Sequence, residues 1–265
     1  MTQYDRLPDP GEGLRLHLNE NTAGCSPRVI DALQRLTAQD LAFYPDYTAV
    51  NRDCARFLGV EEERLLLTNG LDEGLLAACI ANLQRDSGAA GAAGAPGEAI
   101  IVEPAFGMYA DVVSATGGVI VTIQPEPDFA FPLDATLAAI TPRTRLVFLT
   151  SPGNPTGLLI PRDALRAIAK NLPAGALLFL DEAYADFTDE HFLDELPQWP
   201  NIVIGRTFAK SYGLAAVRIG CVIGARQCGD EKYQHACNRF QIAHRAGKGT
   251  DSHDRIVSEV ENRAT

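Results

Sequence analysis

The sequence predicts an α/β protein whose largely parallel β-sheet is covered by helices on both faces. From residue 64 onward, short apolar runs alternate with amphipathic stretches of helical period. The runs are apolar at successive positions, which is typical of parallel strands buried between two helical layers. With 265 residues, 46% of them hydrophobic, the chain can bury a core of this size.

The first 40 residues are expected to form an N-terminal arm and a first helix. The arm, residues 1–25, is irregular and contains Asn19-Glu20-Asn21. Ser26-Pro27 predicts the helix start, because serine favours the N-cap and proline the first helical position. The expected apolar stripe of this helix is Val29, Ile30, Leu33 and Leu36.

Residues 41–225 are expected to form the large domain. It begins with a turn at 42–46, followed by a helix from about residue 50 that stops at Gly59. The expected strands are 65–67, 99–102, 119–123, 146–149, 177–180 and 202–204, and the expected helices between them are 70–83, 109–116, 133–140 and 162–172. Residues 86–97 are rich in glycine and alanine and are predicted to be a flexible surface insertion.

Residues 226–265 have few large apolar residues and no clear period, so we expect a poorly ordered or non-native tail there. Their cysteines and histidines follow no zinc-binding spacing, and we expect no metal site. The cysteines of the chain form no C-x-x-C pair, which predicts reduced, structural thiols. They are Cys25, Cys54, Cys79, Cys221, Cys228 and Cys237.

The formal net charge of −11 argues against nonspecific binding to nucleic acid or anionic membranes. No apolar run approaches the length of a membrane-spanning helix, and the N-terminus lacks a signal-peptide core. We therefore expect a cytoplasmic location. A nucleotide-binding protein is a weaker interpretation, because no G-x-G-x-x-G follows a strand and no P-loop is present.

Polar clusters follow three of the predicted strands. They are Ser151–Gly157, Asp181–Tyr184, and the stretch 206–220 that contains Lys210 and Arg218. Ligands of open α/β sheets bind at the carboxyl ends of the strands, so we expect the three clusters to converge on one ligand.

The residue types in these clusters suit pyridoxal phosphate. Lys210 can form a Schiff base with the aldehyde, and Asp181 can keep the pyridine nitrogen protonated. Asn154 and Tyr184 can donate to the ring oxygen. The phosphate would lie at the start of a helix, against the N–H groups of Leu71 and Asp72, with Thr207 and Arg218 completing its site.

The motifs that carry a family resemblance run in order over about residues 14 to 224. They are HLNENTAGCSPRV, FYPDY, TNGLDEG, EPAFGMY, SPGNPTG, DEAYADF and RTFAKSYGLAAVRIG. As a set they resemble the fold-type I pyridoxal-phosphate aminotransferases, and among these most closely the histidinol-phosphate aminotransferase group. The resemblance implies the aspartate aminotransferase-like large domain, with a truncated small domain.

The resemblance also implies site roles and partners beyond those worked out above. Phe106 would stack on the ring face, and Tyr44 would reach the phosphate of a neighbouring subunit in a homodimer. The implied reaction is transamination of an amino acid or amino-phosphate, with 2-oxoglutarate as acceptor. Lys210 would move the proton, and Asp181 would act with it in catalysis.

Two departures from the family pattern leave other functions open. Ala209 stands where the family usually has serine or threonine, and a lost phosphate hydrogen bond would cost about 1–3 kcal/mol. The motifs stop near residue 225, before the small domain that carries the carboxylate-binding arginine in the family. The alternatives are a decarboxylase of the threonine-phosphate type and a non-catalytic, truncated cofactor-binding remnant.

Overall fold

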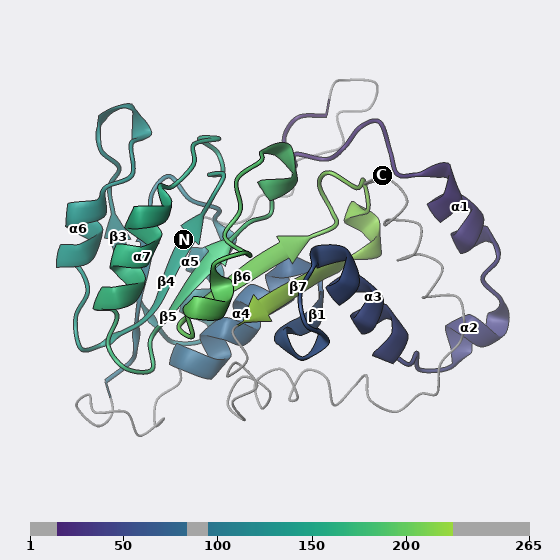
Figure 1. Cartoon of the computed structure of the whole chain (residues 1–265), viewed down its shortest axis with the longest axis horizontal. Helices are drawn as coiled ribbons and strands as arrows, with labels where there is room; N and C mark the ends of the chain where they lie inside the picture. The colour runs from purple at the N-terminus through teal and green to yellow at the C-terminus, as the bar shows by residue number, and fades with distance from the viewer. Residues whose placement is uncertain (1–14, 84–94, 225–265) are drawn as a thin grey trace.

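The structure, a computed structural model, describes residues 15–83 and 95–224. Within these ranges the strands form one sheet in the order β1-β7-β6-β5-β4-β2-β3 (Figure 1). The strands are β1 (Leu65–Asn69), β2 (Glu98–Val102), β3 (Val119–Ile123), β4 (Thr144–Thr150), β5 (Leu177–Asp181), β6 (Ile202–Thr207) and β7 (Ile219–Gly224). Strands β3, β2, β4, β5 and β6 run parallel, which confirms the predicted sheet type.

Strand β7 was not predicted. It lies between β1 and β6 in the sheet. It pairs antiparallel with both β6 and β1, so β1 runs in the same direction as the parallel strands. Its sequence, IGCVIG, contains two glycines, which weaken the strand pattern.

The helices match the predicted ones with two differences. They are α1 (Pro27–Gln34), α2 (Ala38–Ala42), α3 (Thr48–Leu58), α4 (Gly70–Leu83), α5 (Met108–Ala115), α6 (Leu133–Ala138) and α7 (Arg162–Asn171). Single 3₁₀ turns occur at Glu62–Arg64, Pro127–Phe129, Ala185–Phe187, Leu196–Gln198 and Ala215–Val217. Helix α2 was missed: it is short and starts at a capping box between Thr37 and Asp40. The predicted stripe of α1 was wrong at Ile30, which is 45% exposed, and at Leu36, which lies beyond the end of the helix.

Helices cover both faces of the sheet, as predicted. Leu71, Leu75 and Tyr109 of α4 and α5 pack with β-strand side chains in one buried cluster. On the other face, α3 and α7 contribute to a second cluster, and Figure 1 shows α4 and α5 behind the sheet and α7 in front of it. Helices α1 and α2 lie to one side of the sheet.

Some sequence predictions fall outside the described residues. Most of the predicted insertion at 86–97 lies there, as do the predicted tail at 226–265 and two of the six cysteines. The described cysteines, which are Cys25, Cys54, Cys79 and Cys221, are free thiols. In the part of the chain that the structure describes, no helix is long and apolar enough to cross a membrane.

Candidate active site

The strand directions bring the predicted clusters to one edge of the sheet. The carboxyl ends of β4, β5 and β6 lead into Ser151, Glu182 and Phe208, respectively. Strand β1 also ends at this edge, and β7 begins there, because Asn69 pairs with Ile219 and Thr207 with Gly220. This pairing is why Arg218 lies beside the start of α4, although the two are far apart in sequence.

Asp181, the last residue of β5, is a buried acid held by two donors. It is 5% exposed. Its Oδ2 accepts a hydrogen bond from the Tyr109 hydroxyl at 2.6 Å, and its Oδ1 accepts one from the Ala183 N–H at 2.9 Å. Burial raises the pKa of Asp181, while these hydrogen bonds favour the charged form and oppose the rise. The carboxylate is therefore fixed in position at the strand end.

Tyr109 was missed as a site residue by sequence reasoning. It is 1% exposed, at the start of α5, with its ring stacked on Phe148 at 5.1 Å between centroids. Its hydroxyl is 2.7 Å from Thr150 Oγ1. Because the single hydroxyl proton of Tyr109 goes to the carboxylate, Thr150 donates to Tyr109. The motif EPAFGMY marked the segment, but only the fold shows that its tyrosine meets Asp181.

Lys210 lies in the loop after β6 and is half-buried. Its Nζ donates to the carbonyl oxygen of Leu18 at 2.8 Å. Burial lowers the pKa of Lys210, although the nearby Asp72, Glu20 and Asp181 oppose this. A lowered pKa increases the share of the neutral amine, which is the nucleophilic form.

The N-terminal arm contacts the same loop. Asn19 Nδ2 donates to the Tyr184 hydroxyl at 2.8 Å, and Asn21 Nδ2 donates to the Ser211 carbonyl at 2.8 Å. The arm was predicted only as irregular chain. The structure places it against Lys210 and Tyr184, which are two of the predicted site residues.

Arg218 meets the chain where α4 begins. The first N–H groups of a helix have no partner within the helix, and the predicted phosphate donors Leu71 and Asp72 lie in this first turn. Arg218 Nη2 donates to Asp72 Oδ2 at 2.8 Å, and the Gly70 N–H donates to the Arg218 carbonyl at 2.7 Å.

Two glycines allow this close packing. Gly70 has a φ of +69°, and a Cβ there would overlap the Arg218 guanidinium group. A Cβ on Gly220 would lie 2.7 Å from the Leu71 nitrogen. Thr207, 8% exposed, ends β6 beside Gly220 and accepts a hydrogen bond from the Ala209 N–H at 3.2 Å.

The remaining predicted site residues are Phe106, Asn154 and Tyr44. Phe106 contacts Tyr109 edge-on, with centroids 5.8 Å apart. Asn154 lies in the turn after β4, in which the Gly157 N–H bonds the Gly153 carbonyl. Tyr44 is 57% exposed and belongs to the segment between α2 and α3, two helices that Figure 1 shows to one side of the sheet.

A family model for aminotransferase class I and II matches residues 12–260. The chain belongs to this family. The matched range extends past residue 224, where the motif resemblance ends. Family membership confirms the resemblance predicted from the motifs.

The relatives are histidinol-phosphate aminotransferases. The chain is 34% identical over 218 residues to the one from Methanococcoides burtonii, covering 80% of this chain and 56% of the relative. It is 40% identical over 220 residues to the one from Lysinibacillus sphaericus, covering 80% of this chain and 57% of the relative. This aminotransferase-family chain thus spans little more than half the length of the curated relatives it matches.

Solved structures of the family share the fold. A histidinol-phosphate aminotransferase from Sinorhizobium meliloti, in complex with pyridoxal 5'-phosphate, superposes with a TM-score of 0.73 at 25% identity, covering 93% of this chain and 64% of that one. An aspartate aminotransferase from Thermus thermophilus with maleate gives a TM-score of 0.75 at 22% identity, covering 93% and 64%. The aspartate aminotransferase-like fold is therefore confirmed.

Pyridoxal phosphate is the cofactor of this family, and the residues of this chain fit it. The fit rests on the buried Asp181 carboxylate, on the half-buried Lys210 amine and on the close approach of Arg218 to the start of α4, which Gly70 permits. These groups supply a partner for a ring nitrogen, a nucleophile for an aldehyde and donors for a phosphate. Among the described residues, no cluster of histidine, cysteine or acidic side chains suits a metal ion.

Proposed function

We propose that this chain carries the cofactor-binding half of an aminotransferase site. The protein would transfer the amino group of an amino acid or amino-phosphate, of the histidinol-phosphate type, to 2-oxoglutarate. The observation that carries this proposal is the buried Asp181 carboxylate, held by Tyr109 at the same edge of the sheet as Lys210. The histidinol-phosphate aminotransferase relatives support the substrate class.

The positions of Lys210 and Asp181 at the carboxyl ends of the strands support the following roles. When bound, pyridoxal phosphate withdraws electrons from the carbon that bears the substrate amine. Lys210 Nζ, the amine in the loop after β6, would hold the cofactor at its aldehyde group and would serve as the base that takes the proton from the substrate carbon. Asp181 keeps the ring nitrogen protonated, because an ionised carboxylate favours an adjacent cation.

The other predicted residues would bind and orient the cofactor. Asn154 and Tyr184 would donate to the ring oxygen, and Phe106 would cover the ring face. The phosphate would be bound by Thr207, Arg218 and the N–H groups of Leu71 and Asp72, since a guanidinium group and a helix N-terminus both favour phosphate oxygens.

We also propose the larger organisation expected from the sequence. Residues 41–225 would be the cofactor domain of a homodimer, in which Tyr44 reaches the phosphate site of the neighbouring subunit. The 57% exposure of Tyr44 in its own chain supports this role. A cytoplasmic location stays a prediction.

The proposal is tested by purifying the chain with pyridoxal phosphate and following amine transfer from histidinol phosphate to 2-oxoglutarate. The matched variants are Lys210→Ala and Lys170→Ala; Lys170 is an exposed lysine at the end of α7, 5.8 Å from the Trp199 ring centroid. We expect a visible cofactor band that Lys210→Ala removes and Lys170→Ala preserves. Release of carbon dioxide in place of amine transfer would contradict the proposed reaction. A Lys210-dependent band with no turnover on any amino donor would support the cofactor site and contradict transamination by this chain.

A further inference from the structure

Asp186 joins the loop that follows Asp181 to the loop that carries Lys210. It lies in the 3₁₀ turn Ala185–Phe187, and its side chain is 25% exposed. Its Oδ2 accepts a hydrogen bond from the Ser211 hydroxyl at 2.6 Å, and its Oδ1 accepts one from the Tyr212 hydroxyl at 3.3 Å. The two residues directly after Lys210 are therefore bound to one carboxylate.

Asp186 also contacts Arg206, which forms a buried ion pair with Glu182. Arg206 Nη1 lies 3.4 Å from Asp186 Oδ1, and the same guanidinium contacts Glu182 Oε2 at 2.9 Å through both Nε and Nη2. The side chains of Arg206 and Glu182 are 9% and 2% exposed. Glu182 is further fixed by the Phe192 N–H, 2.6 Å from its Oε1. If the Arg206 guanidinium moved, the buried Glu182 carboxylate would lose its ion pair, so Arg206 is held in place beside Asp186.

The loop is held on its other side as well. The Ala209 N–H donates to Thr207 Oγ1, and the Gly213 N–H donates to the Lys210 carbonyl at 3.1 Å. The Tyr212 ring packs against Phe208, with centroids 5.3 Å apart. Asp186 supplies the side-chain contacts that tie this loop to the segment after β5, where Asp181 lies.

We propose that Asp186 is a positioning residue for Lys210, holding the loop 208–214 against the end of β5 through Ser211 and Tyr212. This inference rests on the proposed function, because it assumes that Lys210 must meet a cofactor whose ring nitrogen faces Asp181. Misplacing a reacting group by about 1 Å costs on the order of a hundredfold in rate. A fixed distance between the two loops is therefore a functional requirement.

The first readout needs no cofactor. Amide hydrogen exchange is measured over residues 209–213 in the full chain, comparing wild type with Asp186→Ala, Asp186→Asn and Ser211→Ala. Loss of a hydrogen bond to a charged group is expected to speed exchange in this loop by about tenfold or more for Asp186→Ala. Asp186→Asn keeps an acceptor oxygen for Ser211 and should fall between wild type and Asp186→Ala.

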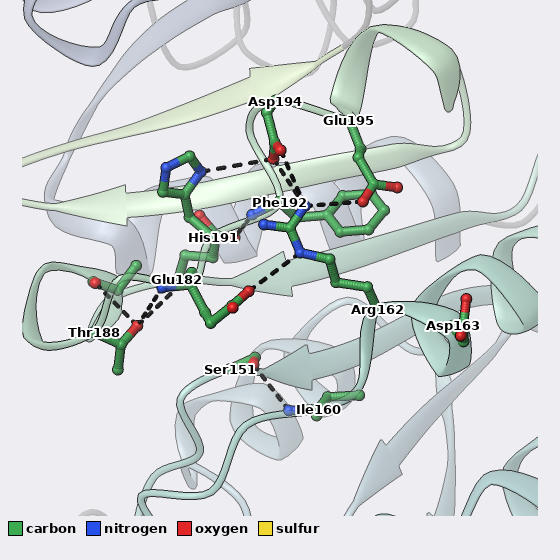
Figure 2. A network of polar contacts seen from close by, with 12 residues as sticks. Ser151, Ile160, Arg162, Asp163, Glu182, Thr188, His191, Phe192, Asp194 and Glu195 are labelled. Carbon is green, nitrogen blue, oxygen red and sulfur yellow. Dashed lines mark hydrogen bonds and ion pairs between the residues drawn. The ribbon is translucent and has the colours of Figure 1, made fainter.

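Glu195→Ala is the matched control. Figure 2 shows Arg162 between Asp194 and Glu195, with which it forms ion pairs. Arg166 also forms an ion pair with Glu195. Glu195 accepts from Arg162 at 2.9 Å and from Arg166 Nε at 2.8 Å, and both of these partners belong to α7. Its removal breaks a comparable set of ion pairs and should leave exchange in 209–213 unchanged.

The second readout is the rate at which the Lys210-dependent visible band forms when pyridoxal phosphate is added. We expect Asp186→Ala and Ser211→Ala each to slow it by about tenfold or more. The double variant should be little slower than Asp186→Ala alone, because each substitution removes the same hydrogen bond between Ser211 and Asp186. If Asp186→Ala fails to fold, Asp186→Asn and Ser211→Ala decide both readouts.

Three results would overturn the inference: wild-type exchange in Asp186→Ala, equal effects in Glu195→Ala, or effects of Asp186→Ala and Ser211→Ala that multiply. A wild-type chain that forms no Lys210-dependent band would instead contradict the proposed function. In that case the exchange data alone decide whether Asp186 holds the loop.

Discussion

We expect Tyr109→Phe to weaken the hold on the Asp181 carboxylate without opening a cavity. The substitution removes one oxygen atom and leaves the ring that stacks on Phe148 at 5.1 Å. It deletes the 2.6 Å hydrogen bond to Asp181 Oδ2 and the 2.7 Å contact with Thr150. The buried carboxylate keeps its hydrogen bond from the Ala183 N–H.

The size of the effect follows from the charge of the acceptor. A hydrogen bond to a charged group contributes about 1.5–3 kcal/mol, against about 0.5–1.5 kcal/mol for a neutral pair. Removing the Tyr109 hydroxyl also takes away an interaction that lowers the pKa of Asp181, so this pKa rises further in the folded state. The folded variant then binds more protons than the unfolded chain over a wider pH window. Its free energy of unfolding therefore falls, relative to wild type, as pH rises through that window.

Urea unfolding of the chain without cofactor measures this effect, at about pH 5 and about pH 8. The destabilisation by Tyr109→Phe should be larger at the higher pH. Thr150→Val is the control, since it removes the hydroxyl next to Tyr109 and no hydrogen bond to Asp181. The reasoning fails if Tyr109→Phe lowers the free energy of unfolding equally at both pH values. It also fails if Tyr109→Phe lowers it as much in a chain that carries Asp181→Asn as in the wild-type chain.

Three further substitutions test other parts of the account. Arg206→Met leaves the Glu182 carboxylate buried without its ion pair and should lower the free energy of unfolding by about 3–5 kcal/mol in a urea titration. Gly220→Ala places a Cβ 2.7 Å from the Leu71 nitrogen and the Gly70 carbonyl carbon, and should cost about 1–3 kcal/mol in the same assay. Arg218→Met should weaken pyridoxal phosphate binding by about tenfold to a hundredfold in a fluorescence titration, with the unfolding midpoint little changed, because its ion pair with Asp72 is exposed.

Much of the sheet could be predicted because its strands are apolar on both faces. The six predicted strands and the helix 70–83 occur in the structure, since each carries a pattern that local sequence is enough to reveal. Strand β7 could not be predicted in the same way. Gly220 permits close packing against the start of α4, a contact between segments about 150 residues apart that the local sequence does not reveal.

Some residues of the candidate site could be predicted from the local sequence, and others only from the fold. Lys210 and Asp181 could be singled out only as a set with Ser151–Gly157, because all three clusters follow predicted strands whose carboxyl ends share one edge of the sheet. Tyr109 was indistinguishable from a core aromatic residue, since only the three-dimensional fold brings its hydroxyl to Asp181. The contacts of the arm with Lys210 and Tyr184 were equally hidden, because an irregular segment carries no pattern that specifies its partner.

The central claim is that Lys210 binds the cofactor, and peptide mapping tests it most directly. The sequence contains four lysines: Lys170, Lys210, Lys232 and Lys248. The chain is incubated with pyridoxal phosphate, reduced with borohydride, digested and analysed by mass spectrometry, which locates any lysine that carries the cofactor. The account predicts the added mass on the Lys210 peptide. Labelling of another lysine in place of Lys210, or no labelling at all, would contradict it.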